Sequence, residues 1–258
     1  MSDLHVHRFG PETGPAVLAL HGVTGHGKRW EALAAEHLPE ARVLAPDLRG
    51  HGRSTGLPPW NFETVVADLV ALLEAEDAGP VVLVGHSFGG ACALHLAHRR
   101  PDLVRSLVLL DSAIGLEPER MLDIALSSLA HPDYDSVAQA RRDKQETGWG
   151  PVEPRLLEAE LDEHLVPTAN GQVGWRMSIP AVNSYWGQLA RGYVLPPAEL
   201  PTVLVQAMRV RPPFLTTEFL AAISERLGSN FRLLQWDCDH MVAQELPAET
   251  AALIRSVL

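Results

Sequence analysis

The stretch Val81-Val82-Leu83-Val84-Gly85-His86-Ser87-Phe88-Gly89-Gly90 joins a short apolar run to a serine enclosed by glycines. Three of its first four residues are β-branched, which predicts a buried strand at 81–84. The apolar residues 91–97 predict a helix directly after it. Ser87 then sits on a tight strand-to-helix turn, where glycines two residues to either side avoid backbone clashes. The pattern predicts an exposed serine whose following amides, at a helix N-terminus, favour developing negative charge.

Composition narrows the class of protein. The 258 residues suffice for one large domain with an inserted lobe, and the net charge of −11 argues against a nucleic-acid binder. Cys92 and Cys238 lack metal-ligand spacing and are too few for a disulfide framework, so we expect reduced thiols and a cytoplasmic protein. We expect neither a metal nor a cofactor. We find no signal peptide, and no apolar run reaches the roughly 18 residues that span a membrane.

Strand-like and helix-like patterns alternate on both sides of this stretch. Beyond 81–84, strands are predicted at 4–9 (an edge strand), 16–20, 42–45, 105–110, 202–206 and 231–236. Helices are predicted at 28–38, 64–73 (with Asn61 as N-cap), 91–97, 217–227 and 248–257. This alternation indicates an α/β fold with a parallel sheet covered on both faces.

The alternation stops between residues 114 and 194. Helical patterns occupy 118–130, 137–146 and 154–165, and Asn170-Gly171 predicts a turn. We therefore expect residues 1–113 and 195–258 to form the core domain, with 114–194 as a mostly helical insertion.

A serine hydroxyl needs a base to act as a nucleophile at neutral pH, and histidine suits that task. Of the 12 histidines, His240 alone follows the last predicted strand in a loop that precedes the last helix. His240 is therefore the predicted base. His26 follows the glycine-rich turn after 16–20 and His86 lies in the serine turn, so both are candidates for substrate contact.

Four elements together resemble the α/β-hydrolase family over nearly the whole chain. They are His21-Gly22-x-x-Gly25, the run Asp47-Leu48-Arg49-Gly50-His51-Gly52-Arg53-Ser54, the serine turn 85–90, and the late His240. The chain is similar to small bacterial serine esterases that carry the triad acid after strand six. The resemblance implies an eight-stranded, mostly parallel sheet with helices on both faces and a helical cap inserted after strand six. It also implies an oxyanion hole made by the amides of Val23 and Phe88.

The acid of the triad departs from the usual family pattern. No carboxylate follows residues 202–206 before Glu218, which lies inside the next predicted helix. Asp111 ends the 105–110 strand on the sheet edge expected for Ser87 and His240, and some family members take the acid from that position. Asp111 is the predicted acid, with Asp237, Asp239 or an acid-free Ser87–His240 dyad as alternatives.

The predicted function is hydrolysis of a small-molecule carboxylic ester through an acyl-enzyme on Ser87. A carbon–carbon bond hydrolase or haloperoxidase-like enzyme, and a non-catalytic ligand-binding protein, remain alternatives. Trp149, Tyr185 and Trp186 could line an acyl pocket, or they could pack the insertion onto the core. Asp47 and Arg53 are interpreted as structural residues of a turn.

Overall fold

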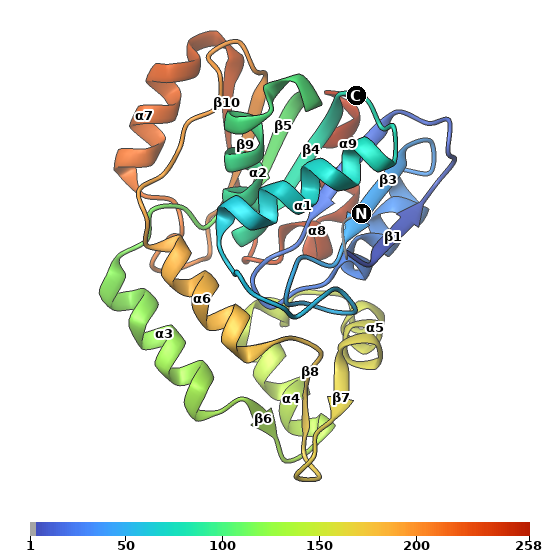
Figure 1. Ribbon diagram of the computed structural model, residues 1–258, viewed down its shortest axis with the longest axis vertical. Helices are drawn as coiled ribbons and strands as arrows, with labels where there is room; N and C mark the ends of the chain where they lie inside the picture. The colour runs from blue at the N-terminus through green and yellow to red at the C-terminus, as the bar shows by residue number, and fades with distance from the viewer. Residues whose placement is uncertain (1–3) are drawn as a thin grey trace.

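A seven-stranded sheet forms the centre of the protein in a computed structural model that describes residues 4–258 (Figure 1). The strand order is β1-β3-β2-β4-β5-β9-β10, in which only β1 is antiparallel to its neighbour. The strands are β1 (Val6–Phe9), β2 (Ala16–Leu20), β3 (Arg42–Pro46), β4 (Val81–His86), β5 (Val104–Leu110), β9 (Thr202–Ala207) and β10 (Phe231–Trp236). The central strand β4 is the one predicted to carry the serine turn.

Residues alternate between the two faces of this sheet, as the period of a strand requires. Leu18, Leu83 and Leu107 enter one apolar core, whereas Val82 and Val108 enter another on the opposite face. The helices of the first face are α1 (Phe62–Ala75), α2 (Phe88–Arg99) and α7 (Thr217–Leu227), and α8 (Val242–Glu245), α9 (Pro247–Arg255), η1 (Gly27–Trp30) and η2 (Leu33–His37) lie on the second. Short turns η3 (Pro101–Leu103) and η5 (Gly228–Asn230) lead into β5 and β10.

Residues 114–194, here named the inserted segment, extend below the sheet in Figure 1. The segment contains α3 (Pro118–Ala130), α4 (Val137–Lys144), η4 (Gln145–Trp149), α5 (Pro154–His164) and α6 (Ile179–Leu189). It also contains a three-stranded antiparallel sheet in the order β6-β8-β7, with β6 (Asp133–Tyr134), β7 (Leu165–Pro167) and β8 (Val173–Trp175). The expectation of a mostly helical insertion did not include this sheet, because strands of two or three residues leave no readable alternation.

Two further details of the predicted fold differ from the structure. The large sheet has seven strands among residues 4–258, not eight, and the insertion follows β5, the fifth of them in chain order. The helix predicted at 28–38 is split into the 3-10 helix η1 and the π-helix η2. The predicted N-cap is confirmed, since the Asn61 side chain accepts a hydrogen bond from the Thr64 amide at 2.9 Å.

The loop after β3 confirms the structural interpretation of Asp47. Its carboxylate accepts hydrogen bonds from the amide of Gly27 at 2.7 Å and from that of Arg53 at 2.8 Å. Burial raises the pKa of Asp47, but the neighbouring His7 and these two amides lower it by more, so the pKa lies well below its usual range. Asp47 thereby ties the 47–54 loop to the start of η1.

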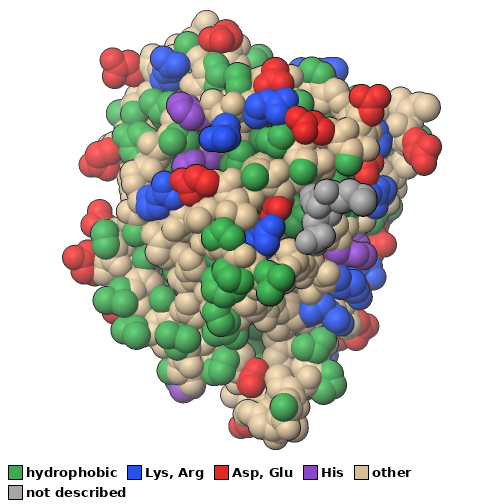
Figure 2. Space-filling model, viewed as in Figure 1, with side chains coloured by type: hydrophobic (Ala, Val, Ile, Leu, Met, Phe, Trp, Pro, Cys, Tyr) green, Lys and Arg blue, Asp and Glu red, His purple; other side chains and the backbone are tan. Residues whose placement is uncertain are grey.

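Figure 2 shows hydrophobic side chains spread over the inserted segment and charged ones concentrated over the half that holds the large sheet. On α3, Leu122, Leu126 and Leu129 are each more than half exposed, at 58%, 55% and 56%. Within residues 4–258, none of the helices is both long enough and apolar enough to cross a bilayer. Cys92 and Cys238 are buried free thiols. The cytoplasmic location inferred from their reduced state stays a prediction.

Candidate active site

Ser87 occupies the turn between β4 and α2 with a left-handed backbone, at φ 54° and ψ −121°. This conformation is unfavourable for a residue with a side chain and is held here by its surroundings. The Ser87 amide donates to the carbonyl of Leu110 at 3.1 Å, and the Ser87 carbonyl accepts from the Gly90 amide at 2.9 Å. The turn is thus fixed to both the end of β5 and the start of α2.

The flanking glycines are required by close backbone approaches, as predicted. A Cβ on Gly85 would lie 2.5 Å from the carbonyl oxygen of Gly89, and a Cβ on Gly89 would lie 2.5 Å from that of Leu20. Neither neighbour is a flexible side chain, so any larger residue would displace the backbone of the turn.

Asp111 and His240 meet at the carboxyl end of the sheet. Asp111 follows β5 with a φ of 40° and is 1% exposed. Its Oδ2 lies 2.6 Å from His240 Nδ1, and its Oδ1 accepts from the Ala207 amide at 3.1 Å. Ala207 ends β9, the strand after which most of the family carries its acid, so a backbone amide there anchors Asp111 instead.

The two alternative acids lie elsewhere. The Asp237 side chain is 92% exposed and lies 3.9 Å from Arg209. The Asp239 amide donates to Glu245 at 2.8 Å, and within residues 4–258 its carboxylate makes no hydrogen bond or ion pair with the His240 ring. Of the carboxylates weighed from the sequence, Asp111 is therefore the one that contacts His240.

The His240 ring is oriented by three neighbours. Because a carboxylate accepts hydrogen bonds, the pairing with Asp111 puts the hydrogen on Nδ1 and leaves Nε2 as an acceptor. The ring centroid lies 4.4 Å from that of Phe214 and 4.6 Å from that of His86. His86 Nε2 donates to the His240 carbonyl at 2.7 Å. Burial and the nearby His240 lower the pKa of His86 well below its usual value, so His86 is neutral.

Ser87 and His240 line the same cavity, of about 470 Å³, between the sheet and the inserted segment. Within residues 4–258, no hydrogen bond joins the Ser87 hydroxyl to His240. Hydrogen bonds of this kind are often long before a substrate binds. Much of the cavity wall is apolar, including Ile124, Trp149, Trp175, Met177, Trp186 and Phe214.

The amides predicted for the oxyanion hole belong to Val23 and Phe88. Phe88 directly follows Ser87 in the chain, and Val23 lines the cavity. Phe88 is the first residue of α2, where an amide has no partner within its helix. Within residues 4–258, neither amide donates to a protein acceptor. The Val23 carbonyl accepts from His51 Nε2, and the same loop is held where His21 Nε2 accepts from the Leu48 amide at 2.9 Å. Two amide donors are therefore free near the serine.

The structure brings three of the five predicted pocket residues to the cavity and leaves two away from it. His86, Trp149 and Trp186 line the cavity. Tyr185 is fully buried, donates its hydroxyl to the Arg49 carbonyl at 3.0 Å and packs on Phe88. Successive residues of a helix point about 100° apart, so Trp186 reaches the cavity while Tyr185 enters the core.

His26 is the other residue that does not line the cavity. Its Nε2 lies 2.9 Å from Glu160 Oε2, and its ring stacks on that of His164 at 4.7 Å. His26 lines a neighbouring pocket, and Arg29 borders both that pocket and the cavity that holds Ser87. The prediction that His26 lines the catalytic pocket is wrong, because the inserted segment supplies a carboxylate that holds it away.

The arginine and the lysine that line the cavity, Arg29 and Lys144, were among the residues that the sequence analysis missed. Both pair with the buried Glu160: Arg29 Nε lies 2.9 Å from Oε2, and Lys144 Nζ lies 2.8 Å from Oε1. Lys144 also sits over the Trp175 ring at 4.3 Å. Burial lowers the pKa of Lys144 to about 8 despite the attraction of Glu160. In the sequence, Lys144 ends a charged run that looks like a solvated helix face.

Comparison with known proteins identifies the family. A family model described as the alpha/beta hydrolase fold matches residues 15–254. The lipase LipV of Mycobacterium tuberculosis is 53% identical over 99% of this chain and 98% of its own length. The sn-1-specific diacylglycerol lipase ABHD11 of Mus musculus is 33% identical over 66% of this chain and 57% of its own length.

Solved structures give the same fold. A marine microorganism esterase superposes over 100% of both chains with a TM-score of 0.78 and 19% identity, a level that supports the fold alone. The chain therefore belongs to the α/β-hydrolase fold family, and it is a carboxylic ester hydrolase of the lipase and esterase kind.

Proposed function

We propose that Ser87, His240 and Asp111 are the nucleophile, the base and the acid of this ester hydrolase. The observation that carries the proposal is the 2.6 Å contact between Asp111 Oδ2 and His240 Nδ1, in a cavity that Ser87 also lines. With Nδ1 committed to Asp111, Nε2 is the nitrogen left to accept the serine proton.

The reaction would proceed in two halves. Ser87 Oγ attacks the ester carbonyl carbon while His240 Nε2 takes the hydroxyl proton, and His240 then protonates the departing alkoxide. The acyl group remains on Ser87 as an ester. A water molecule that gives its proton to His240 attacks this acyl-enzyme, and Ser87 recovers its proton as the carboxylic acid leaves.

The amides of Val23 and Phe88 would stabilise the oxyanion of both tetrahedral intermediates. Neither donates within the described chain, and that of Phe88 stands at the positive end of the α2 helix dipole. The Val23 amide would not have to move during the reaction, because two hydrogen bonds hold its loop in place. His51 donates to the Val23 carbonyl, and the Leu48 amide donates to His21.

We further propose that residues 114–194 act as a cap over a core made of residues 1–113 and 195–258. Trp149 and Trp186 of this cap, with His86 of the core, would contact the acyl group. A cavity of about 470 Å³ with apolar walls suits a small or medium acyl chain. The LipV relative is named a lipase, which favours a lipid-derived ester as the substrate.

The carbon–carbon hydrolase alternative needs a positive group free to bind an anionic substrate. The arginine and the lysine of the cavity, Arg29 from the core and Lys144 from the cap, both pair with Glu160. The geometry therefore favours an uncharged ester over an anionic ring-cleavage product.

A series of p-nitrophenyl esters from acetate to decanoate tests the proposal on the full chain. Wild type should show a burst of p-nitrophenol, and Ser87→Ala should lose on the order of 10⁶-fold in kcat. Ser128→Ala is a matched control, because Ser128 lines the same cavity but bonds to the Ile124 carbonyl.

The control should keep the burst and change kcat less than threefold. Equal release by wild type and Ser87→Ala would show that Ser87 is not the nucleophile. A burst that disappears in Ser128→Ala but persists in Ser87→Ala would show that Ser128, and not Ser87, is the nucleophile.

A further inference from the structure

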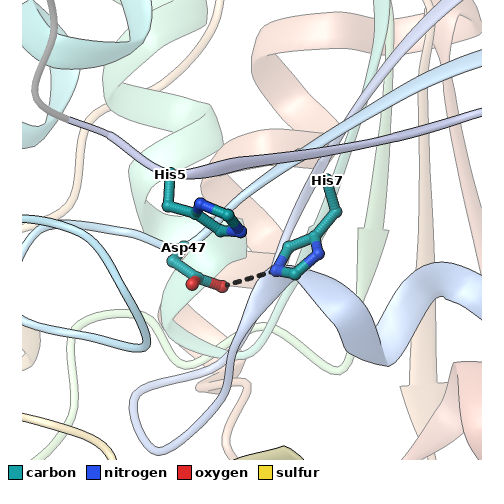
Figure 3. Close-up of side chains that lie close together, drawn as sticks. All are labelled: His5, His7 and Asp47. Atoms are coloured by element: carbon teal, nitrogen blue, oxygen red, sulfur yellow. Dashed lines mark ion pairs between the residues drawn. The ribbon is translucent and has the colours of Figure 1, made fainter.

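His5, just before β1, and His7, within β1, lie opposite Asp47, which directly follows the neighbouring strand β3 (Figure 3). His5 and His7 are two residues apart in extended chain, so their side chains share one face of the sheet. The antiparallel register pairs Val6 with Pro46, which sets His5 opposite Asp47, and the Asp47 amide donates to the His5 carbonyl at 2.9 Å. Sequence position and pairing thus place three side chains on one face.

Figure 3 shows the three side chains converging, with ring nitrogens of both histidines turned toward the Asp47 carboxylate. One possible ligand atom from each residue lies within 4.8 Å of the other two. None of the three lines the catalytic cavity. Among residues 4–258, this is the one group of three or more histidine, cysteine or acidic side chains that meets this condition.

The Asp47 carboxylate is held in place. Its side chain is fully buried, and the amides of Gly27 and Arg53 each occupy one lone pair on a different oxygen. A carboxylate oxygen has two lone pairs, so Oδ1 keeps one that faces the histidines. A ligand would therefore find this carboxylate already oriented.

His7 supplies a second, independent observation. Its Nε2 is shielded from solvent yet makes no hydrogen bond within the described chain. It lies 3.3 Å from Asp47 Oδ1. Neighbouring ligands of a tetrahedral Zn²⁺ ion, with bonds of about 2.0–2.2 Å, lie roughly 3.4 Å apart. The spacing of these two atoms is therefore compatible with two ligands of one metal ion.

The charge of Arg53 reaches His5, but Arg53 pairs with Glu163, whose charge acts on His5 in the opposite direction. Asp47 then supplies a negative charge that no lysine or arginine side chain among residues 4–258 offsets by an ion pair. Two imidazoles and one carboxylate are ligands that Zn²⁺ and related transition metals prefer, whereas Ca²⁺ and Mg²⁺ prefer oxygen.

We propose that His5, His7 and Asp47 bind one divalent transition-metal ion, with Zn²⁺ the best match and water in the fourth position. The ion would tie β1 to the 47–54 loop. Because that loop also carries His51, which donates to the Val23 carbonyl, the ion would brace the loop that presents the Val23 amide. Its role is structural, and it takes no part in the ester chemistry.

Calorimetric titration of the full-length, chelator-treated protein with ZnCl₂ tests the site. Wild type should bind one Zn²⁺ and gain thermal stability as Zn²⁺ rises, by mass action. His7→Asn and His5→Asn should each weaken binding by about 10–100-fold, since each removes one ligand. His37→Asn, a partly buried histidine on η2, and His240→Asn should bind Zn²⁺ as wild type does.

The partly exposed His5 keeps the test decisive if His7→Asn fails to fold, which circular dichroism would reveal. Wild type that binds no Zn²⁺ at 1 mM overturns the proposal. So does unchanged affinity in His5→Asn, or binding that disappears in His240→Asn, which would assign the ion to the catalytic cavity. Failure of this proposal leaves the esterase proposal untouched, because ester hydrolysis is measured separately.

Discussion

Two buried carboxylates each hold a histidine in this protein, one in the core and one in the inserted segment. Asp111 contacts His240 at 2.6 Å, and Glu160 contacts His26 at 2.9 Å. Both carboxylates are almost fully buried, at 1% and 3% exposed. The pairs differ in what else reaches the carboxylate: Asp111 accepts from a backbone amide, whereas Glu160 also accepts from Arg29 and Lys144.

This difference separates a pair suited to catalysis from one suited to structure. The charge of Glu160 is already offset, since Arg29, Lys144 and His26 together lower its pKa well below the usual value although burial raises it. No lysine or arginine among residues 4–258 pairs with Asp111. Asp111 can therefore stabilise an imidazolium that forms on His240, whereas the charge of Glu160 is shared with the permanent cation Arg29 and with Lys144.

Among changes to these two pairs, the largest expected effect comes from Asp111→Asn, which should lower kcat for a p-nitrophenyl ester by about 10⁴-fold. The asparagine amide would donate to His240 Nδ1 and so move the hydrogen to Nε2, the nitrogen that must accept the serine proton. Asp239→Asn is the matched control, because Asp239 is the sequence neighbour of His240 and should keep kcat within about threefold. Full activity in Asp111→Asn would show that another residue is the acid, or that Ser87 and His240 act as a dyad without one.

Glu160→Gln should affect stability where Asp111→Asn affects activity. Removing this carboxylate leaves Arg29 and Lys144 buried without a counter-charge, which typically costs about 3–5 kcal/mol in the free energy of unfolding. Urea denaturation measures this loss, and kcat should change less than about tenfold. A kcat loss near that of Asp111→Asn in a stably folded Glu160→Gln protein would abolish the distinction between the two pairs.

Glu163→Gln is the control for this stability effect on the same helix, α5. Its partners Lys28 and Arg53 have side chains 39% and 40% exposed, so water can replace the carboxylate. The loss should be at most about 1 kcal/mol.

The pair proposed for catalysis, Asp111 and His240, was predictable from the sequence, and the pair of Glu160 and His26 was not. Ser87, Asp111 and His240 each follow an apolar run, and parallel strands bring their carboxyl ends to one edge. The structure was needed to choose Asp111 over Asp237, Asp239 or an acid-free dyad, and to show the supporting amide of Ala207.

The Glu160 cluster joins residues 26, 29, 144 and 160, which meet only because the inserted segment docks on the core. The spacing of apolar residues within one helix or strand gives no sign of such docking. From the sequence, Lys144 therefore looks solvated and His26 looks like a pocket residue. The strands β6, β7 and β8 were unreadable for a different reason, since each has only two or three residues. Likewise, the sequence does not show that His5 and His7 lie near Asp47, which follows from the register between β1 and β3.

The smallest expected effect tests whether Lys144 carries a burial cost within the Glu160 cluster. Its folded-state pKa is about 8, lowered from 10.5 mainly by burial. Between these two values the unfolded chain keeps the lysine proton and the folded chain does not. Stability therefore rises with pH across this window, because the unfolded state binds more protons.

Lys144→Met should remove this rise, since methionine can fill the space over Trp149 and Trp175 without a titrating group. The difference in unfolding free energy, wild type minus Lys144→Met, should increase by about 1–3 kcal/mol from pH 8 to 10.5. Other titrating groups cancel in this difference. Lys28→Met, which removes a lysine that is 39% exposed, should retain the wild-type rise. A flat difference for Lys144→Met would mean that Lys144 stays protonated through the window, so that its attraction to Glu160 outweighs its burial.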